Sequence, residues 1–214
     1  MSTLPSTLDE SVHQVIPPGV AQLASALVRA AHAPAVLVTI DPTMEDGGLS
    51  HGVHCDSVPR VILGAELLDD EMRLYGVLVH EVAHHALRHG QGAIRQWEAA
   101  SQAAAGLAGA AIIVGLPVWV TAAAAVAAIA ARLASARVQR REEYEADRYS
   151  VRLLDAVGMD GHAIVTATLA ALSQESRFYR LAGWIVGSHP TPDARRHAIR
   201  QAAQPEAITA GEPR

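Results

Sequence analysis

The chain has 214 residues, of which 50% are hydrophobic and 18% charged, enough for one domain with a substantial core. Its net charge is −5, so the chain lacks the excess of positive charge that is typical of nucleic-acid-binding proteins. All seventeen cationic side chains are arginine, so chemistry that requires a lysine, such as Schiff-base formation, is excluded. Cys55 is the only cysteine, which excludes an intrachain disulfide.

Residues 1–18 are predicted to form a flexible lead that closes at Pro17-Pro18. The opening residues, MSTLPSTLDE, have neither a basic patch nor an apolar core, so they do not form a secretory signal. We therefore expect a protein that acts on the cytoplasmic side and is not secreted. One globular domain is expected over residues 19–203, followed by a disordered tail over 204–214.

The first part of that domain is expected to contain one helix and three short strands. Residues 19–31 are rich in Ala and Leu with a helical pattern, and residues 35–40 (AVLVTI) read as a strand. Turn signals follow, and two more short strands are predicted near residues 51–54 and 60–63.

The most informative stretch is His80-Glu81-Val82-Ala83-His84, an H-E-x-x-H pattern. Asp70 precedes an apolar run that leads into it, and Gly90 follows, so one helix from about 70 to 90 is predicted to carry the motif. Residues four apart share a helix face, so both imidazoles can reach one metal ion. Glu81 falls where it could deprotonate a water on that metal. Two nitrogen ligands, a carboxylate base and an open position are what zinc-assisted hydrolysis needs. Other histidines are interpreted as structural, with His89 placed in the last turn of this helix.

Residues 99–131 contain no charge, and Pro117 divides them into two helical halves. One interpretation is a membrane-embedded hairpin over about 99–134, with arginines flanking both ends on the cytoplasmic side. The other is a pair of helices packed on the protein core or on another subunit. The pattern leaves both open.

A third metal ligand is expected within REEYEADRY, residues 141–149. Glu143 and Asp147 are four apart and share a helix face. One carboxylate can ligate the metal, while the other accepts the spare N–H of a ligating histidine. That helix is expected to end at Gly158, and further helices are predicted over 161–176 and 192–203. Thr191 and Pro192 suit the N-cap and first position of the last helix.

HEVAH, EYEAD and the late His189-Pro190 together resemble the HtpX-like and CAAX-prenyl-protease-like zinc metallopeptidases, a branch of the gluzincins, over roughly residues 35–200. The resemblance implies a mostly helical α+β fold with a small sheet beside the H-E-x-x-H helix. One of the two later strands would be the edge that binds an extended peptide. The apolar hairpin would be inserted between the two metal-ligand helices.

The same resemblance implies that His80, His84 and Glu143 hold one Zn²⁺ per chain and that Asp147 bonds to His80. It implies that Glu81 is the catalytic base. His189 would be an oxyanion stabiliser or a removable fourth ligand; a structural His-Pro turn is the alternative. The family usually has Pro-Thr after the His-Pro, and an aliphatic residue after a later arginine that corresponds to Arg195. This chain has Thr191-Pro192 and Arg196, which leaves the orientation of His189 open.

The function predicted from these residues is a zinc-dependent metalloendopeptidase that uses a metal-activated water on a protein or peptide substrate, in protein quality control at a membrane. Two alternatives are a non-enzymatic zinc-stabilised membrane assembly or chaperone-like subunit, and a repressor-cleaving ImmA-like peptidase. The intact Glu81 argues against a purely structural zinc site, which would usually close its fourth position. The pairing of EYEAD with His-Pro argues against the ImmA-like reading.

Overall fold

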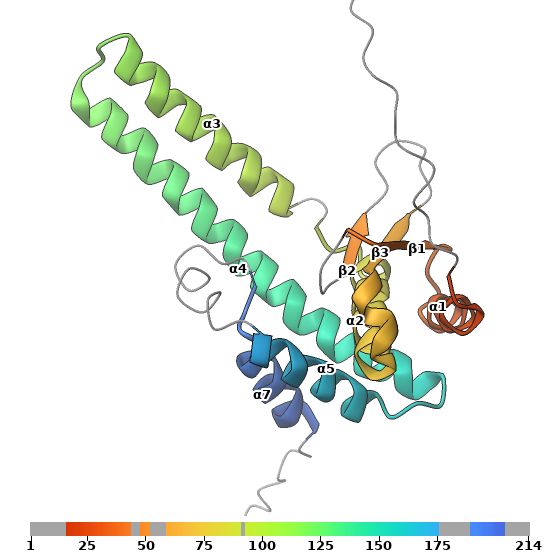
Figure 1. The fold of residues 1–214 in the computed structure, drawn as a ribbon. Coiled ribbons are helices and arrows are strands. Elements are labelled where there is room, and N and C mark those ends of the chain that lie inside the picture. Colours follow the sequence, from red (N-terminus) through yellow and green to blue (C-terminus); the bar gives the residue numbers. More distant parts are fainter. Residues whose placement is uncertain (1–15, 44–47, 52–58, 91–92, 176–188, 204–214) are drawn as a thin grey trace, which may run out of the picture. The chain divides into compact units, whose positions relative to one another are not determined.

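The computed structural model describes residues 16–43, 48–51, 59–90, 93–175 and 189–203 (Figure 1). The chain divides into two compact units. The first comprises Met1–Arg88 and Tyr149–Thr168, and the second comprises His89–Arg148 and Leu169–Arg214. The predicted limits of one domain over 19–203 stay a prediction.

The first unit contains a small mixed sheet beside the H-E-x-x-H helix. Helix α1 (Pro18–Ala30) precedes strands β1 (Leu37–Asp41), β2 (Gly48–His51) and β3 (Arg60–Gly64), and the 3-10 helix η2 (Ala65–Asp69) leads into α2 (Glu71–Ala86). The strand order is β1-β3-β2, with β1 parallel and β2 antiparallel to β3. Helix α2 packs against α1, β2, β3 and η2. The predicted mostly helical α+β fold is confirmed, and β2, one of the two later strands, lies at an edge.

Helix α2 is held by an apolar face on one side. Leu74, Leu78 and Val82 recur every four residues and are buried, as the helical period requires. They belong to the core of the first unit with the fully buried side chains of α1, the sheet, η2 and α4, namely Leu27, Ile40, Val61, Leu63, Leu67 and Leu154. The Asp70 carboxylate caps the helix by accepting from the Arg73 N–H at 3.1 Å. These constraints fix the rotation of α2 and therefore the face that carries the two histidines.

The C-terminal end of α2 differs from the prediction. The helix ends at Ala86 rather than near Gly90, because Arg88 already adopts a left-handed conformation with φ of 56°. Gly90 is left-handed as well, with φ of 72°, but it lies beyond the helix. His89 is therefore not in the last helical turn. It belongs to the second unit, where its Nε2 lies 3.8 Å from Glu145 Oε2.

The predicted apolar hairpin is formed by α3 (Ala93–Ile113) and α4 (Val118–Ala156) (Figure 1), and it belongs to the second unit up to Arg148 of α4. The turn between them holds Pro117 and Gly115, whose φ of 70° suits glycine. Two bonds join the arms: Ser101 Oγ donates to the Ala128 carbonyl at 3.1 Å, and Gln139 Nε2 donates to Glu98 Oε1 at 3.1 Å. Helix α3 begins before the uncharged stretch of residues 99–131, and α4 extends beyond its end.

Helix α4 also joins two elements that the sequence pattern separated. The second arm of the hairpin and the helix that bears EYEAD are one continuous helix of 39 residues. No glycine or proline occurs between Val118 and Ala156, so nothing in this segment interrupts the helix. Its end comes just before Gly158, which has a φ of 83°, as predicted.

The remaining helices also match their predicted ranges. Helix α5 (Gly161–Glu175) starts after Asp160, whose carboxylate accepts from the Ala163 N–H at 2.8 Å. Helix α7 (Pro192–Ala203) starts after Thr191, whose Oγ1 accepts from the Ala194 N–H at 3.3 Å. Residues 1–15 of the flexible lead predicted over 1–18 lie outside the described residues, as do residues 52–54 of the strand predicted near 51–54, Cys55 and the predicted tail over 204–214.

Candidate metal centre

Helix α2 brings the two histidines of HEVAH together. The Nε2 atoms of His80 and His84 lie 3.0 Å apart, and the rings are nearly perpendicular, at an interplanar angle of 84°. Two imidazole nitrogens bound to one tetrahedral Zn²⁺ at about 2.05 Å would lie about 3.3 Å apart. The observed spacing is close to this value. The pair therefore fits a shared divalent cation, and the predicted placement of both imidazoles on one helix face is confirmed.

Glu81 follows the first histidine and is buried in the first unit. Its neighbours Val82 and Ala83 are fully buried, whereas His80 and His84 are half-buried. The two histidines of the motif are thus half-buried, whereas its three middle residues are buried. The role of Glu81 as the catalytic base stays a prediction.

Tyr75 of α2, about one helical turn before the motif, has a perturbed acidity. Tyr75 donates a hydrogen bond to Glu71, and this bond raises the pKa of the Tyr75 hydroxyl above its usual value of 10.0. Burial and the negative charge of Glu71 act in the same direction. Tyr75 therefore stays protonated throughout the neutral range and adds no charge to the helix.

Glu143 and Asp147 share one face of α4 in the second unit, as the spacing predicted. Both are buried, at 5% and 2% relative exposure. Such carboxylates require partners in the protein. Arg195 of α7 is a partner of each: its Nη1 lies 2.9 Å from Glu143 Oε2, and its Nε and Nη2 donate to the two Asp147 oxygens at 2.7 and 2.6 Å.

The role of Arg195 is the main feature of the site that sequence reasoning missed. The available signal was its place six residues after His189, in a chain segment with a recognisable motif. The fork of a guanidinium allows it to bond to two carboxylates one helical turn apart. Arg195 thereby fixes the orientation of both. The predicted bond from Asp147 to His80 joins residues of the two units and stays a prediction.

His189 lies against the same carboxylate. Its Nδ1 is 2.9 Å from Glu143 Oε1, although 69% of its side chain is exposed. Pro190 beside it is buried, and the helix cap at Thr191 follows at once. The His-Pro segment therefore holds an accessible imidazole next to Glu143, and the role of that imidazole stays a prediction.

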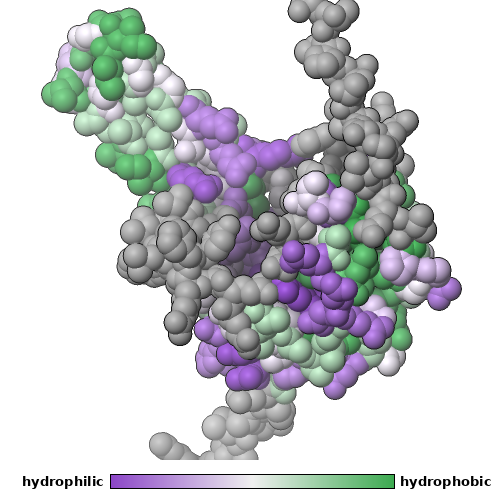
Figure 2. Space-filling model, viewed as in Figure 1, coloured by the Kyte–Doolittle hydropathy of each residue, from purple (hydrophilic) through white to green (hydrophobic). Residues whose placement is uncertain are grey.

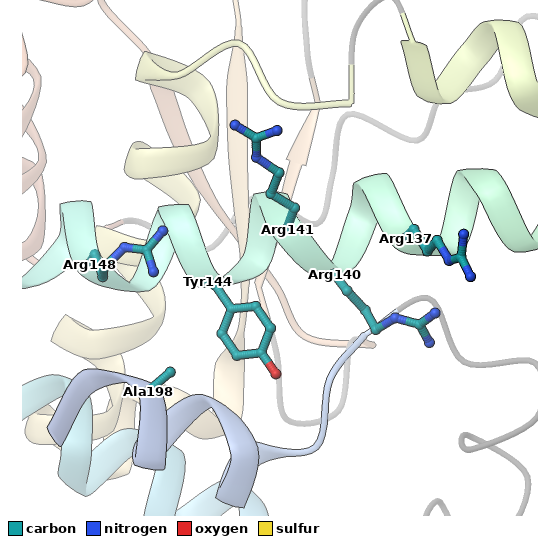
Figure 3. Close-up of a pocket in the computed structure, with 6 residues that line it drawn as sticks. All are labelled: Arg137, Arg140, Arg141, Tyr144, Arg148 and Ala198. Atoms are coloured by element: carbon teal, nitrogen blue, oxygen red, sulfur yellow. The ribbon is translucent and has the colours of Figure 1, made fainter. Parts of the chain in front are cut away.

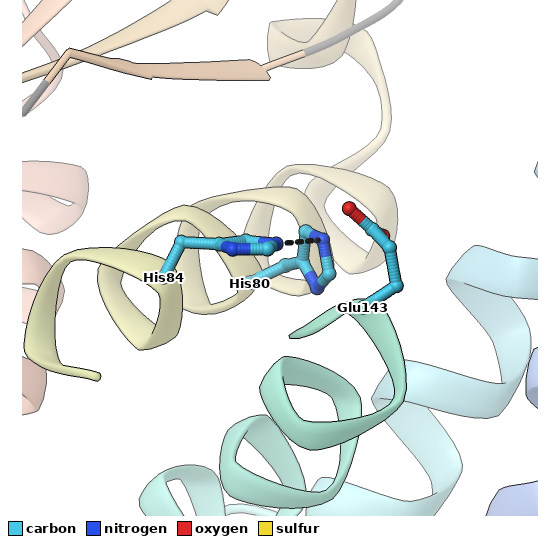
Figure 4. A group of neighbouring side chains, drawn as sticks. All are labelled: His80, His84 and Glu143. Atoms are coloured by element: carbon cyan, nitrogen blue, oxygen red, sulfur yellow. Dashed lines mark hydrogen bonds between the residues drawn. The ribbon is translucent and has the colours of Figure 1, made fainter. Parts of the chain in front are cut away.

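Three side chains of the described residues form a group that could hold a metal ion: His80, His84 and Glu143 (Figure 4). Each offers one ligand atom, two of them imidazole nitrogens and one a carboxylate oxygen. Two histidines and one acidic residue are a ligand set typical of catalytic zinc sites in peptidases. The assignment of these three residues as ligands of one metal ion joins residues of the two units and stays a prediction.

The fold and these residues are those of a metallopeptidase: an H-E-x-x-H helix beside a small sheet, and a later helix with two buried carboxylates four residues apart. The family model for peptidase family M48 matches residues 58–203, which is most of the chain. The protein belongs to this family, and the predicted resemblance is confirmed. No curated protein and no solved structure matches the chain.

Proposed function

We propose that the protein is a zinc-dependent metalloendopeptidase in which His80, His84 and Glu143 hold one Zn²⁺. Membership of family M48 supports the peptidase class. The observation that carries the ligand assignment is the pair of imidazole nitrogens 3.0 Å apart on α2, because this spacing suits one metal ion. Glu143 is the third ligand in this proposal, and Arg195 and His189 hold its carboxylate in place.

The reaction follows from the roles of these side chains. When bound, the zinc ion polarises the scissile carbonyl and makes a water molecule more acidic. Glu81 takes a proton from the attacking water and later delivers it to the leaving amine. His189 stabilises the developing negative charge on the carbonyl oxygen. Asp147 orients a ligating imidazole and Arg195 orients Asp147. The edge strand β2 binds an extended substrate by adding a strand to the sheet.

We also propose that the protein works at a membrane, on the cytoplasmic side. Helix α4 is long and apolar enough to cross a bilayer, and only 17% of its most apolar window is buried. A core helix of a soluble protein would be mostly buried. Large apolar side chains are exposed at the turn of the hairpin, including Ile113 at 86%, Val118 at 83% and Trp119 at 70%. Figure 2 shows this end of the hairpin as hydrophobic on the face in view. An exposed apolar surface of this kind is expected to contact lipid or another protein.

The test of the peptidase proposal is Glu81→Gln. We expect this variant to retain zinc at one ion per chain and to lose casein cleavage by on the order of 10³-fold, since the proton-transfer group is gone while the ligands remain. The matched control is Glu71→Gln, a carboxylate in the first turn of the same helix, which should leave cleavage nearly unchanged.

Metal analysis and cleavage with and without a chelator complete the experiment. Wild-type activity should disappear with the metal and return when zinc is added. A Glu81→Gln protein as active as the wild type would refute the assigned base. Bound zinc without any cleavage by the wild type would favour a structural zinc protein instead.

A further inference from the structure

Helix α4 carries a row of arginines that the proposed chemistry does not use. Arg137, Arg141 and Arg148 recur at intervals of four and seven residues, so they share one helix face with Arg140 and Tyr144. These five side chains and Ala198 of α7 line a pocket of about 500 Å³ (Figure 3). All of its lining residues belong to the second unit. Three of the four guanidinium groups are on exposed residues, and Arg140 is half-buried.

The acidic side chains of the same helix are engaged elsewhere. Glu142 accepts from the Gly90 N–H at 2.9 Å, and Glu145 lies near His89. Glu143 and Asp147 pair with Arg195. Among the residues that the structure describes, no carboxylate forms an ion pair with the four pocket arginines. Cations three and four residues apart on a helix repel one another, so this face is suited to an anionic ligand.

The position of the pocket along α4 indicates the kind of anion. The uncharged part of the helix ends at Ala131, and the last large exposed apolar side chain, Leu133, lies four residues before Arg137. At 1.5 Å per residue, Arg137 to Arg141 follow Leu133 within about 12 Å. This is roughly where lipid headgroups lie when an apolar helix enters a bilayer. Acidic peptides could also satisfy the charge, but they would not account for the exposed apolar segment next to the arginines.

We propose that Arg137, Arg140, Arg141 and Arg148 of α4, with Tyr144, form a binding surface for the phosphates of anionic lipid headgroups. Guanidinium groups form paired hydrogen bonds with phosphate oxygens, and the tyrosine hydroxyl can donate another. The site is separate from the metal ligands. It rests on the proposed membrane contact of the hairpin and is independent of the peptidase activity.

The test compares two triple variants of the full-length protein in vesicle co-sedimentation. Arg137→Gln, Arg141→Gln and Arg148→Gln remove three charges from the pocket. Arg29→Gln, Arg152→Gln and Arg200→Gln remove three charges from exposed helical positions outside it. The vesicles contain phosphatidylcholine alone or phosphatidylcholine with phosphatidylglycerol. Inorganic phosphate and a polyglutamate peptide are added in separate competition arms. Far-UV circular dichroism checks that each variant is folded.

Wild-type protein should bind the anionic vesicles more tightly than the neutral ones. The pocket triple should lose on the order of 100-fold in affinity for the anionic vesicles, and the control triple less than about 5-fold. Glu81→Gln should bind as the wild type does, which separates this proposal from the peptidase assignment. Equal losses in the two triples, or no preference for anionic vesicles, would overturn the proposal. Displacement by millimolar inorganic phosphate would identify a free-phosphate site, and displacement by polyglutamate an acidic-peptide site; either outcome would also overturn it.

Discussion

Arg195 is the residue on which the buried charges of the second unit depend. Its guanidinium contacts both Glu143 and Asp147, and all three side chains are largely removed from solvent. Removing one partner of a buried ion pair leaves an uncompensated charge, which typically costs several kcal/mol. The stability of this region should therefore be sensitive to Arg195 and insensitive to its neighbour Arg196, which pairs with the exposed Asp193.

We predict that Arg195→Gln lowers the free energy of unfolding by about 3–4 kcal/mol. Arg196→Gln should lower it by less than about 1 kcal/mol, because exposed ion pairs contribute little. Urea denaturation of the chelator-treated proteins measures both values. Adding Asp147→Asn to Arg195→Gln should restore part of the loss, since one unpaired charge is removed. Equal effects of the two arginine substitutions would show that the buried pairs are not formed.

At the residue scale the sequence predicted which of these side chains share a helix face, since both motifs depend on local helical spacing. His80 and His84 are on one face of α2, and Glu143 and Asp147 on one face of α4, because residues four apart always share a face. The Arg195 contacts could not be predicted in this way. They join Arg195 to residues 48 and 52 positions earlier in the chain, and no local pattern specifies such pairs.

At the scale of elements, α2 depends on a close approach to α5. A Cβ atom built on Gly76 would lie 2.7 Å from the Thr168 Cβ and would overlap its hydroxyl group. Thr168 itself is buried and donates to the Ile164 carbonyl at 2.9 Å, so it has little freedom to move. Glycine at position 76 is thus required by packing, although it lowers the intrinsic stability of the helix.

We predict that Gly76→Ala destabilises the protein by about 1–3 kcal/mol through overpacking. The matched control is Gly106→Ala in α3, where a Cβ would meet nothing within 4 Å. That substitution should leave stability unchanged or raise it by up to about 1 kcal/mol, since alanine favours helix. Thermal unfolding of the two variants distinguishes these effects. A stabilised Gly76→Ala protein would show that α2 and α5 are not in the contact described.

The helices and strands were predicted within a few residues wherever caps, glycines and prolines mark their ends. Thr191 and Pro192 mark the start of α7, and Gly158 follows the end of α4. The continuity of α4 was missed because the sequence changes there from apolar to charged. That change in composition alters the surroundings of the helix but does not interrupt its backbone hydrogen bonds. The end of α2 was placed too late because Arg88, rather than a glycine, adopts the left-handed conformation.

At the scale of the whole molecule, the family and the peptidase class follow from three short motifs that are far apart in the chain. The charge pattern of α4 adds a feature that those motifs do not describe, since four arginines line a pocket beside an apolar hairpin. Substrate specificity could not be predicted, because it depends on the shape of a surface made from several elements and not on local spacing.

The central claim is that Glu143 completes a zinc site with His80 and His84. The most direct test is the zinc affinity of Glu143→Gln beside Glu145→Gln, a carboxylate two residues away on α4, measured by competition with a chelating dye. We predict that Glu143→Gln weakens zinc binding by roughly 100-fold or more, while Glu145→Gln stays within about threefold of the wild type. A Glu143→Gln protein that binds zinc as tightly as the wild type would contradict the account.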